Sequence, residues 1–254
     1  MPVRIAKDLP ARKFLEKENI FVMTYERAEK QDIRPLRVAV LNLMPNKIDT
    51  ETQLLRLIGN TPLQVEVVFL TTATYTSTHT SEEHLTSFYK TFDEIIAEKQ
   101  KFDGLVVTGA PVEKMDFTDV AYWSEFERIM EWASKNVYSS MYICWAAQAA
   151  MYYYYGVDKT IKDKKIFGVF PHKVRHRTNP LVRGFDDYFY APHSRYTDID
   201  RAEFDKIKDV KVLAHSEEAG VYLASSKDLR RVFVFGHGEY DAESLKNEYE
   251  RDVA

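Results

Sequence analysis

Short apolar runs that alternate with helical segments restrict the fold of this chain more than any other feature. Residues 37–43 form an apolar run, residues 51–58 place leucine and isoleucine at helical spacing, and residues 64–70 alternate in a β-branched pattern. The same order continues with a helix, a strand, a helix and a strand, expected at 81–97, 104–108, 119–135 and 138–144. Such alternation predicts an α/β fold with a mostly parallel central sheet flanked by helices, and with reactive groups at the carboxyl ends of the strands.

The second half of the chain has a different pattern. Strand-like runs follow one another with few helices between them, at 166–174, 187–191, 211–215, 220–224 and 231–235. This predicts an antiparallel extension of the sheet, followed by a last helix at 241–251. No internal repeat or low-complexity linker divides the chain. We therefore expect one domain over residues 1–254, with an irregular, partly apolar arm at 1–35 and an α/β core at 36–254.

Composition and charge exclude several classes of protein. The chain has 254 residues, 45% hydrophobic and 29% charged, which favours a globular protein over disorder or a coiled coil. The formal net charge of -4 gives no basic field for nucleic acid. The apolar runs are far shorter than the roughly 20 residues that cross a bilayer, and residues 1–14 lack the pattern of a secretory signal. We expect no membrane association and a cytoplasmic location.

The chain's single cysteine lies where an expected strand meets an expected helix. Residues 142–150 read Tyr-Ile-Cys-Trp-Ala-Ala-Gln-Ala-Ala, with Cys144 at the joint. In a nucleophile elbow, a tight turn of this kind exposes the nucleophile, and the following helix N-terminus stabilises a thiolate. A lone cysteine is more often a small buried apolar residue. This segment alone therefore leaves a catalytic and a structural interpretation open.

A second polar segment follows the expected strand at 231–235. It reads Phe-Gly-His-Gly-Glu-Tyr over residues 235–240. Residues two apart on an extended loop project to the same side, so Glu239 can hold the His237 ring while the other ring nitrogen faces Cys144. An ordinary surface turn would fit this segment taken alone. Together, the two strand-end segments favour a cysteine, histidine and glutamate triad.

These residues resemble a known family. The Cys144 elbow with His237-x-Glu239 resembles the class I glutamine amidotransferases, and within that superfamily the chain is most similar to the homoserine O-acyltransferases of the MetA type, which act in methionine biosynthesis. The similar segments are FVMT at 21–24, DIRPL at 32–36, LNLMPNK at 41–47, QLLRLIGNTP at 53–62, TGAPVE at 108–113 and APHSR at 191–195. The resemblance implies a flavodoxin-like, class I glutamine amidotransferase-like fold.

The resemblance also implies roles for individual residues. It implies an acyl-thioester on Cys144, with His237 as general base and Glu239 as the partner of that base. Substrate contacts and a site-lining role are implied for Lys165, Ser194, Arg251 and Lys47. An arginine suits an amino-acid carboxylate because its guanidinium offers two parallel donors. For the arginine and for the site-lining lysine, an ordinary solvated side chain remains the alternative.

The tetrahedral intermediate of acyl transfer needs fixed hydrogen-bond donors for its oxyanion. The backbone amides of Ala110 and Trp145 are the natural candidates, because Ala110 follows a strand end and Trp145 follows the nucleophile. Lys47 could add positive charge nearby. We therefore expect an oxyanion hole made of these two amides.

Glu113 bears on which acyl group is transferred. Two like charges about 4 Å apart, at an effective dielectric constant near 20, repel by about 4 kcal/mol, which would exclude a succinyl carboxylate near Glu113. In the family that the chain resembles, glutamate at this position accompanies acetyl-coenzyme A and glycine accompanies succinyl-coenzyme A. The expected reaction is transfer of acetyl from acetyl-coenzyme A to L-homoserine by a ping-pong mechanism. An exposed loop glutamate without this role is the alternative.

Several other readings stay open. Serine is an alternative acceptor, because one methylene discriminates by only about 1 to 3 kcal/mol. Family members usually continue beyond the segment at 248–252, while this sequence ends at Ala254, and they commonly have proline where this chain has Gly238, so we expect a more open acceptor pocket and a looser loop. Succinyl transfer, glutamine hydrolysis with an ammonia-accepting partner, and a non-catalytic relative are further alternatives.

The expected cofactors and partners follow from the same resemblance and from the histidines. The seven histidines show no metal-ligand spacing, so we expect no metal and no bound cofactor, with acetyl-coenzyme A as co-substrate. The expected partners are small-molecule substrates, without nucleic acid, and the resemblance implies a homodimer.

Overall fold

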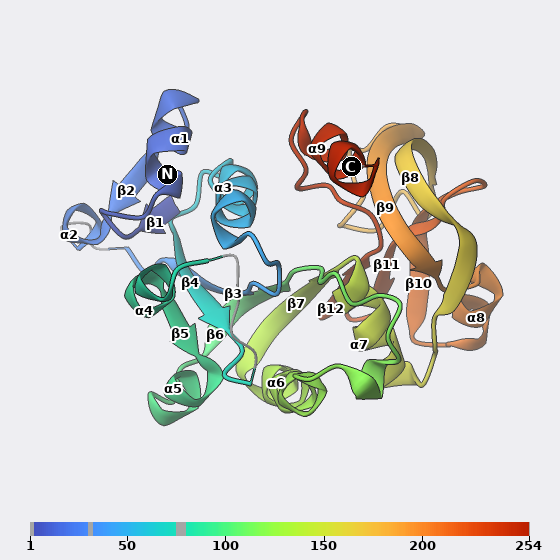
Figure 1. The fold of residues 1–254 in the computed structure, drawn as a ribbon, viewed down its shortest axis with the longest axis horizontal. Coiled ribbons are helices and arrows are strands. Elements are labelled where there is room, and N and C mark those ends of the chain that lie inside the picture. The colour runs from blue at the N-terminus through green and yellow to red at the C-terminus, as the bar shows by residue number, and fades with distance from the viewer. Residues whose placement is uncertain (1–2, 30–32, 75–79, 254) are drawn as a thin grey trace. The chain divides into compact units, whose positions relative to one another are not determined.

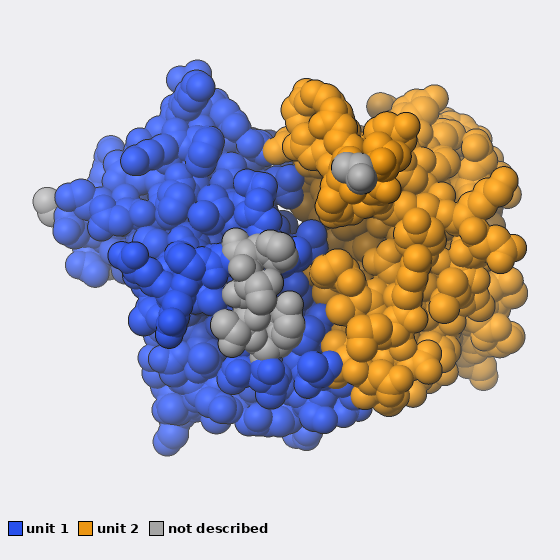
Figure 2. All heavy atoms as spheres, in the orientation of Figure 1, with its two compact units in different colours: residues 1–108, 121–140 blue, residues 109–120, 141–254 orange. Residues whose placement is uncertain are grey.

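The computed structural model describes residues 3–29, 33–74 and 80–253. These residues form two compact units (Figure 2). Unit 1 comprises residues 1–108 and 121–140, and unit 2 comprises residues 109–120 and 141–254. The expected single domain stays a prediction.

Unit 1 is built on a parallel sheet. Its strand order is β2-β1-β4-β3-β6-β7, with β5 beside β4. The strands are β1 (Val3–Ile5), β2 (Val22–Thr24), β3 (Leu36–Leu41), β4 (Val65–Thr71), β5 (Tyr89–Thr91), β6 (Phe102–Val107) and β7 (Val137–Ile143). The pairs β1–β2, β1–β4, β3–β4, β3–β6 and β4–β5 are all parallel. The expected parallel arrangement of the first half is confirmed.

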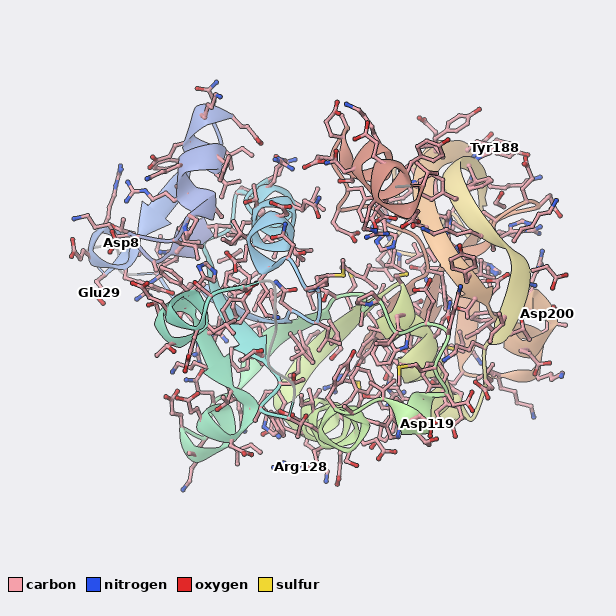
Figure 3. All side chains as sticks on the ribbon, in the orientation of Figure 1. Asp8, Glu29, Asp119, Arg128, Tyr188 and Asp200 are labelled. Atoms are coloured by element: carbon pink, nitrogen blue, oxygen red, sulfur yellow. The ribbon has the colours of Figure 1, made fainter. Side chains whose placement is uncertain are left out.

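Helices cover both faces of this sheet. They are α1 (Ala11–Lys17), α2 (Tyr25–Ala28), α3 (Lys47–Ile58), α4 (Glu82–Phe88), α5 (Phe92–Ala97) and α6 (Trp123–Asn136). The ribbon shows α3 on one side of the sheet and α5 and α6 on the other (Figure 1). Helix α6 buries Phe126, Ile129, Met130 and Ala133 at helical spacing, while Arg128 lies on its outer side (Figure 3). Amphipathic spacing therefore fixes which side of α6 packs on the sheet.

Two segments of unit 1 differ from the sequence prediction. The arm at 1–35 was expected to be irregular, but it contributes β1 and β2 to the parallel sheet, and α1 buries Leu15 completely. Strands of three residues are too short to show a periodicity. The expected helix at 81–97 is divided into α4 and α5 by β5, because Thr91 starts α5 with a capping box that includes Glu94.

Unit 2 is built on antiparallel strands. They are β8 (Thr160–Val174), β9 (Tyr188–Asp198), β10 (Val210–Ser216), β11 (Gly220–Ser226) and β12 (Arg231–Val234), in the order β12-β11-β10-β8-β9. All four neighbouring pairs are antiparallel, as expected. The last residues of β7 belong to this unit and lie beside β12. Unit 2 also contains η1 (Phe117–Asp119), α7 (Trp145–Tyr155), α8 (Arg201–Lys206) and α9 (Ser244–Val253).

A buried polar chain runs through β8 and β9. Arg195 is fully buried and donates hydrogen bonds to Asp198 Oδ1 at 3.0 Å, to the Ala219 carbonyl at 2.6 Å and to His193 Nδ1. Because arginine only donates, His193 carries its proton on Nε2, which lies 2.9 Å from His172 Nε2. Burial, with the charge of Arg195, lowers the pKa of His172 to about 4 and that of His193 further. Both rings are therefore neutral at pH 7.

Within the described residues, no helix has the length and apolar character needed to cross a membrane.

Candidate active site

Cys144 lies on a sharp turn between β7 and α7. Its backbone has φ 52° and ψ -114°, and a positive φ is uncommon for a residue other than glycine. Its amide donates to the Val234 carbonyl of β12 at 2.7 Å, and its carbonyl accepts from the amides of Ala147 and Gln148 at 3.0 and 3.3 Å. This is the strand, turn and helix geometry of a nucleophile elbow.

His237 and Glu239 follow β12 and lie beside this turn. The His237 amide donates to the Pro192 carbonyl at 2.9 Å, and its ring Nδ1 lies 2.6 Å from Glu239 Oε1. Burial opposes a charge on this ring, but the negative charges of Cys144 and Glu239, and hydrogen bonds to both, raise the pKa of His237 well above its usual range. The structure thus brings the three predicted triad residues together, with the imidazole between the Cys144 side chain and the Glu239 carboxylate.

The loop that carries His237 has glycine on either side of it, and Tyr222 explains both. A Cβ at Gly236 would lie 2.8 Å from the Pro192 carbonyl oxygen and from the Tyr222 ring, and a Cβ at Gly238 would lie 2.9 Å from the Tyr222 hydroxyl. Tyr222 is itself 9% exposed. Gly238, expected to loosen the loop, thus allows it to approach the buried Tyr222.

The segment that follows β6 also reaches the triad. A Cβ at Gly109 would lie 3.3 Å from Cys144 Cβ and 3.8 Å from His237 Cε1. The absence of a side chain at Gly109 therefore lets the loop backbone approach the nucleophile. Ala110, the next residue, is 6% exposed, and Trp145 is the first residue of α7. The two predicted oxyanion donors, Ala110 and Trp145, therefore directly follow Gly109 and Cys144, which lie close to each other.

Glu113 lies farther along the same loop and is half-buried. Burial raises the pKa of Glu113, and the charge of Glu248 adds to that rise. The backbone amide of Tyr196 and the charges of Lys165 and Lys114 act in the opposite direction. Glu113 is therefore not the freely solvated loop glutamate of the alternative interpretation.

Lys165, Ser194 and Arg251 come from β8, β9 and α9 and meet around two carboxylates. Ser194 Oγ donates to Glu248, and Lys165 Nζ lies 3.7 Å from Glu248 and 2.6 Å from Asp252. Arg251 donates to Asp252 at 2.8 and 2.9 Å, and its side chain is 66% exposed. The three predicted substrate contacts therefore share one cluster, with Arg251 on its solvent side.

Glu248 and Tyr240 are two functional candidates that the sequence reasoning missed. Tyr240 donates its hydroxyl to Glu248 and stacks its ring on His237, with centroids 4.2 Å apart and planes 21° apart. A signal existed in the sequence. Tyr240 directly follows the histidine and glutamate segment. Glu248 precedes Arg251 by three positions, which places Glu248 and Arg251 on one face of a helix.

Lys47 belongs to unit 1, whereas the other predicted site residues belong to unit 2. It is 3% exposed, and its Nζ donates to the Asn42 carbonyl at 2.6 Å. Burial lowers the pKa of Lys47 to about 8, against the opposing charge of Glu51. Glu51 in turn accepts hydrogen bonds from Tyr89 at 2.6 Å and His84 at 2.8 Å. The solvated lysine of the alternative interpretation is therefore wrong.

Comparison with solved structures supports the fold. A glutamine amidotransferase from Thermotoga maritima aligns with a TM-score of 0.59 at 13% identity, covering 87% of this chain and 86% of that one. The glutaminase domain of Trypanosoma brucei CTPS, solved with bound acivicin, aligns with a TM-score of 0.55 at 12% identity, covering 81% and 87% of the two chains. At this identity the likeness concerns the fold, and it confirms the expected amidotransferase-like architecture.

Sequence comparison identifies the family. The family model described as homoserine O-succinyltransferase matches residues 2–254. The homoserine O-acetyltransferase of Acetivibrio thermocellus is 56% identical over 254 residues, which cover all of this chain and 83% of that protein. The homoserine O-acetyltransferase of Petrotoga mobilis is also 56% identical, over 253 residues and 81% of its length. The chain therefore belongs to the homoserine O-succinyltransferase family, on a fold that it shares with the glutamine amidotransferases.

Proposed function

We propose that this protein is a homoserine O-acetyltransferase, which transfers the acetyl group of acetyl-coenzyme A to the hydroxyl of L-homoserine. The observation that carries the proposal is the Cys144, His237 and Glu239 triad, with its raised His237 pKa. Relatives with 53% to 56% identity over nearly the full chain bear that name. A protonated imidazole beside a thiolate is the resting state of a nucleophilic cysteine.

The first half-reaction loads the cysteine. The Cys144 thiolate attacks the carbonyl carbon of acetyl-coenzyme A, and the bond from that carbon to the coenzyme A sulfur breaks. Coenzyme A leaves as a thiol, because the His237 imidazolium donates its proton to the departing sulfur. The backbone amides of Ala110 and Trp145 are the proposed donors to the oxyanion of the intermediate. The products are free coenzyme A and an acetyl-thioester on Cys144.

The second half-reaction transfers the acetyl group. Neutral His237 takes the proton of the homoserine hydroxyl as that oxygen attacks the thioester carbon. The bond from carbon to Cys144 Sγ breaks, the ester product leaves, and the thiolate and imidazolium pair is restored. Glu239 keeps the ring oriented and stabilises its positive charge in both half-reactions.

The cluster around Glu248 is the proposed acceptor site. A carboxylate such as Glu248 suits the ammonium group of the amino acid, and Lys165 and Arg251 suit its carboxylate. Ser194, which donates to Glu248, is proposed to border the acceptor side chain. Serine stays the alternative acceptor, because the two amino acids differ by one methylene.

Glu113 supports acetyl over succinyl. Burial is the largest cause of its raised pKa, because desolvation disfavours a charged carboxylate. A succinyl carboxylate would add a further like charge, at a cost of about 4 kcal/mol for a separation near 4 Å. Acetyl carries no such charge. The family name alone would suggest succinyl transfer, the alternative, whereas Glu113 favours acetyl transfer.

The remaining parts of the proposal are a cytoplasmic homodimer that uses acetyl-coenzyme A as co-substrate, without a bound metal or cofactor. The single cysteine and the thiol chemistry support a reducing compartment. Lys47 is proposed to supply positive charge to the substrates.

The test is the release of coenzyme A thiol from acetyl- or succinyl-coenzyme A, with homoserine or serine as acceptor. We expect turnover with acetyl-coenzyme A and homoserine, and loss of at least about 10³-fold in Cys144→Ala, because the intermediate is covalent. A preference for serine would change the acceptor and keep the mechanism. Absence of turnover with all four pairs would overturn the proposal.

A further inference from the structure

Tyr240 touches both halves of the proposed site. Its ring lies flat on the His237 ring, 4.2 Å between centroids and 21° between planes. Its hydroxyl donates to Glu248 Oε1, and the other carboxylate oxygen accepts from Ser194. Tyr240 therefore connects His237, the proposed base, to Glu248, the carboxylate proposed to bind the ammonium group of the acceptor.

The stacked ring restricts the orientation of the base. Hydrogen bonds to Glu239, 2.6 Å from His237 Nδ1, and to Cys144 fix the positions of the ring nitrogens, but they leave the ring plane free to tilt about the line that joins these nitrogens. A parallel aromatic neighbour removes that freedom, because rotation would bring ring atoms into collision. The face of a phenol ring also attracts a cation, so the stack favours the imidazolium form of His237.

The hydroxyl determines how Glu248 is presented. Burial, with the charge of Glu248, raises the pKa of Tyr240 above its ordinary range, so the hydroxyl stays protonated and donates. A carboxylate has about four acceptor sites, and Tyr240 and Ser194 occupy one on each oxygen of Glu248. Acceptor sites remain for an ammonium group, and the two donors hold the carboxylate in one orientation for it.

We propose that Tyr240 is a positioning residue that couples the acceptor site to the catalytic base: its ring orients His237, and its hydroxyl orients Glu248 toward the ammonium group of the amino-acid acceptor. The inference rests on the proposed function. It deepens that function, because the ring contact with His237 is assigned to formation of the thioester and the hydroxyl contact with Glu248 to binding of the acceptor. Loss of the hydroxyl should weaken acceptor binding alone, whereas loss of the ring should also slow formation of the thioester.

Two substitutions separate these effects. Tyr240→Phe keeps the stacked ring and removes the hydroxyl, and Tyr240→Leu removes both. The first half-reaction is measured alone, as the burst of coenzyme A thiol on rapid mixing with acetyl-coenzyme A without acceptor. The second is followed as the KM for homoserine in steady state. Tyr190→Phe is the matched control, because Tyr190 is 72% exposed and lies outside the site.

In Tyr240→Phe we expect a burst rate within about twofold of the native rate and a KM for homoserine raised about tenfold or more, since a lost hydrogen bond to a charged group weakens binding by that factor. In Tyr240→Leu we expect the burst rate to fall about tenfold as well, because small misplacements of a catalytic group are costly. The Tyr190→Phe control should match the native protein in both measurements.

Two results would overturn the inference. An unchanged KM in Tyr240→Phe would show that the hydroxyl does not orient the acceptor site. An equal loss of burst rate in Tyr240→Phe and Tyr240→Leu would show that the ring contact does not orient His237. Absence of a burst in the native protein would instead contradict the proposed function, so the two failures are distinguishable.

Discussion

At the scale of single residues, Glu113 is where acyl preference is tested most directly. We predict that Glu113→Gly gains turnover with succinyl-coenzyme A while it retains turnover with acetyl-coenzyme A. Removing a like charge worth about 4 kcal/mol should change the ratio of kcat/KM for the two donors by roughly 100-fold or more. The measurement is coenzyme A release with each donor at saturating homoserine. Glu113→Gln, which removes the charge and keeps the side chain, should shift the ratio in the same direction.

An unchanged donor ratio in both Glu113 variants would mean that the glutamate charge does not face the acyl group. A shift in Glu113→Gly alone would assign the effect to side-chain volume. The pair of substitutions therefore separates electrostatic exclusion from steric exclusion.

Lys47 gives a prediction for stability against pH. Burial holds the pKa of Lys47 at about 8, below the ordinary 10.5 that an unfolded chain would show. Between these values the unfolded chain binds more protons than the native one, so this residue makes the free energy of unfolding rise as pH rises. We expect the free energy of unfolding of the native protein, minus that of Lys47→Met, to increase by about 2 kcal/mol from pH 7 to pH 10.

Urea denaturation of both proteins at the two pH values measures this difference, and groups common to both cancel. A difference that stays constant with pH would contradict the burial of Lys47. Since the pattern of the sequence indicates only a solvated loop lysine here, this burial could not be predicted from the residues alone. It depends on the packing of α3, which carries Lys47 and Glu51 one turn apart.

At the scale of elements, the loop after β12 is held by a backbone hydrogen bond as well as by its own side chains. We predict that Gly236→Ala loses roughly 100-fold in kcat/KM, because a Cβ 2.8 Å from the Pro192 oxygen and the Tyr222 ring must displace the His237 amide from its hydrogen bond. Gly104→Ala in β6 is the matched control, since its Cβ would meet Val38 at an ordinary 3.5 Å.

The expected result is a large loss for Gly236→Ala with a small effect for Gly104→Ala. Equal activities of the two variants would mean that the loop can shift without displacing the base. Thermal unfolding of both variants shows whether any loss of activity comes from loss of the fold.

Elements were predicted unevenly, for physical reasons. The longer strands of both halves carry apolar runs, and most of them are predicted within a few residues. The exceptions are β8, which begins six residues before the predicted run, and β9, which ends seven residues after it. The three-residue strands β1, β2 and β5 carry no such pattern, and their existence depends on pairing with β4 or with each other. Helix α8 was missed because its six residues give less than two turns.

The site was predicted to a similar extent. The triad follows from two strand-end segments, and chain position marks Tyr240 and Glu248 as candidates. Their contacts depend on how α9 meets β9, which no local pattern contains. The APHSR segment at 191–195 contributes to the family resemblance, but the sequence gives no physical reason for these residues. The structure gives one: Pro192 accepts from the His237 amide, Ser194 donates to Glu248, and Arg195 anchors the buried histidines.

At the scale of the whole molecule, ligand binding should stabilise the folded chain. We predict that homoserine at about 100 times its Kd stabilises the native protein by about 2.7 kcal/mol, which raises Tm by roughly 5 °C for a chain of this size. The shift should be much smaller in Arg251→Ala, which lacks the proposed carboxylate contact. A thermal melt with and without homoserine measures it, and an equal shift in both proteins would exclude Arg251 from the acceptor site.

The hydrogen bond from the Cys144 amide to the Val234 carbonyl has a consequence for how such proteins change specificity. The nucleophile is tied to β12, and the base follows the same strand three residues after Val234. A displacement of β12 therefore moves the thiol and the imidazole together, and Pro192 of β9 and Tyr240 hold the imidazole from the other side. The acceptor cluster is supplied by other elements, β8, β9 and α9. Substitutions in that cluster that keep the contacts of Pro192 and Tyr240 with His237 can therefore exchange one substrate for another without moving the reactive pair.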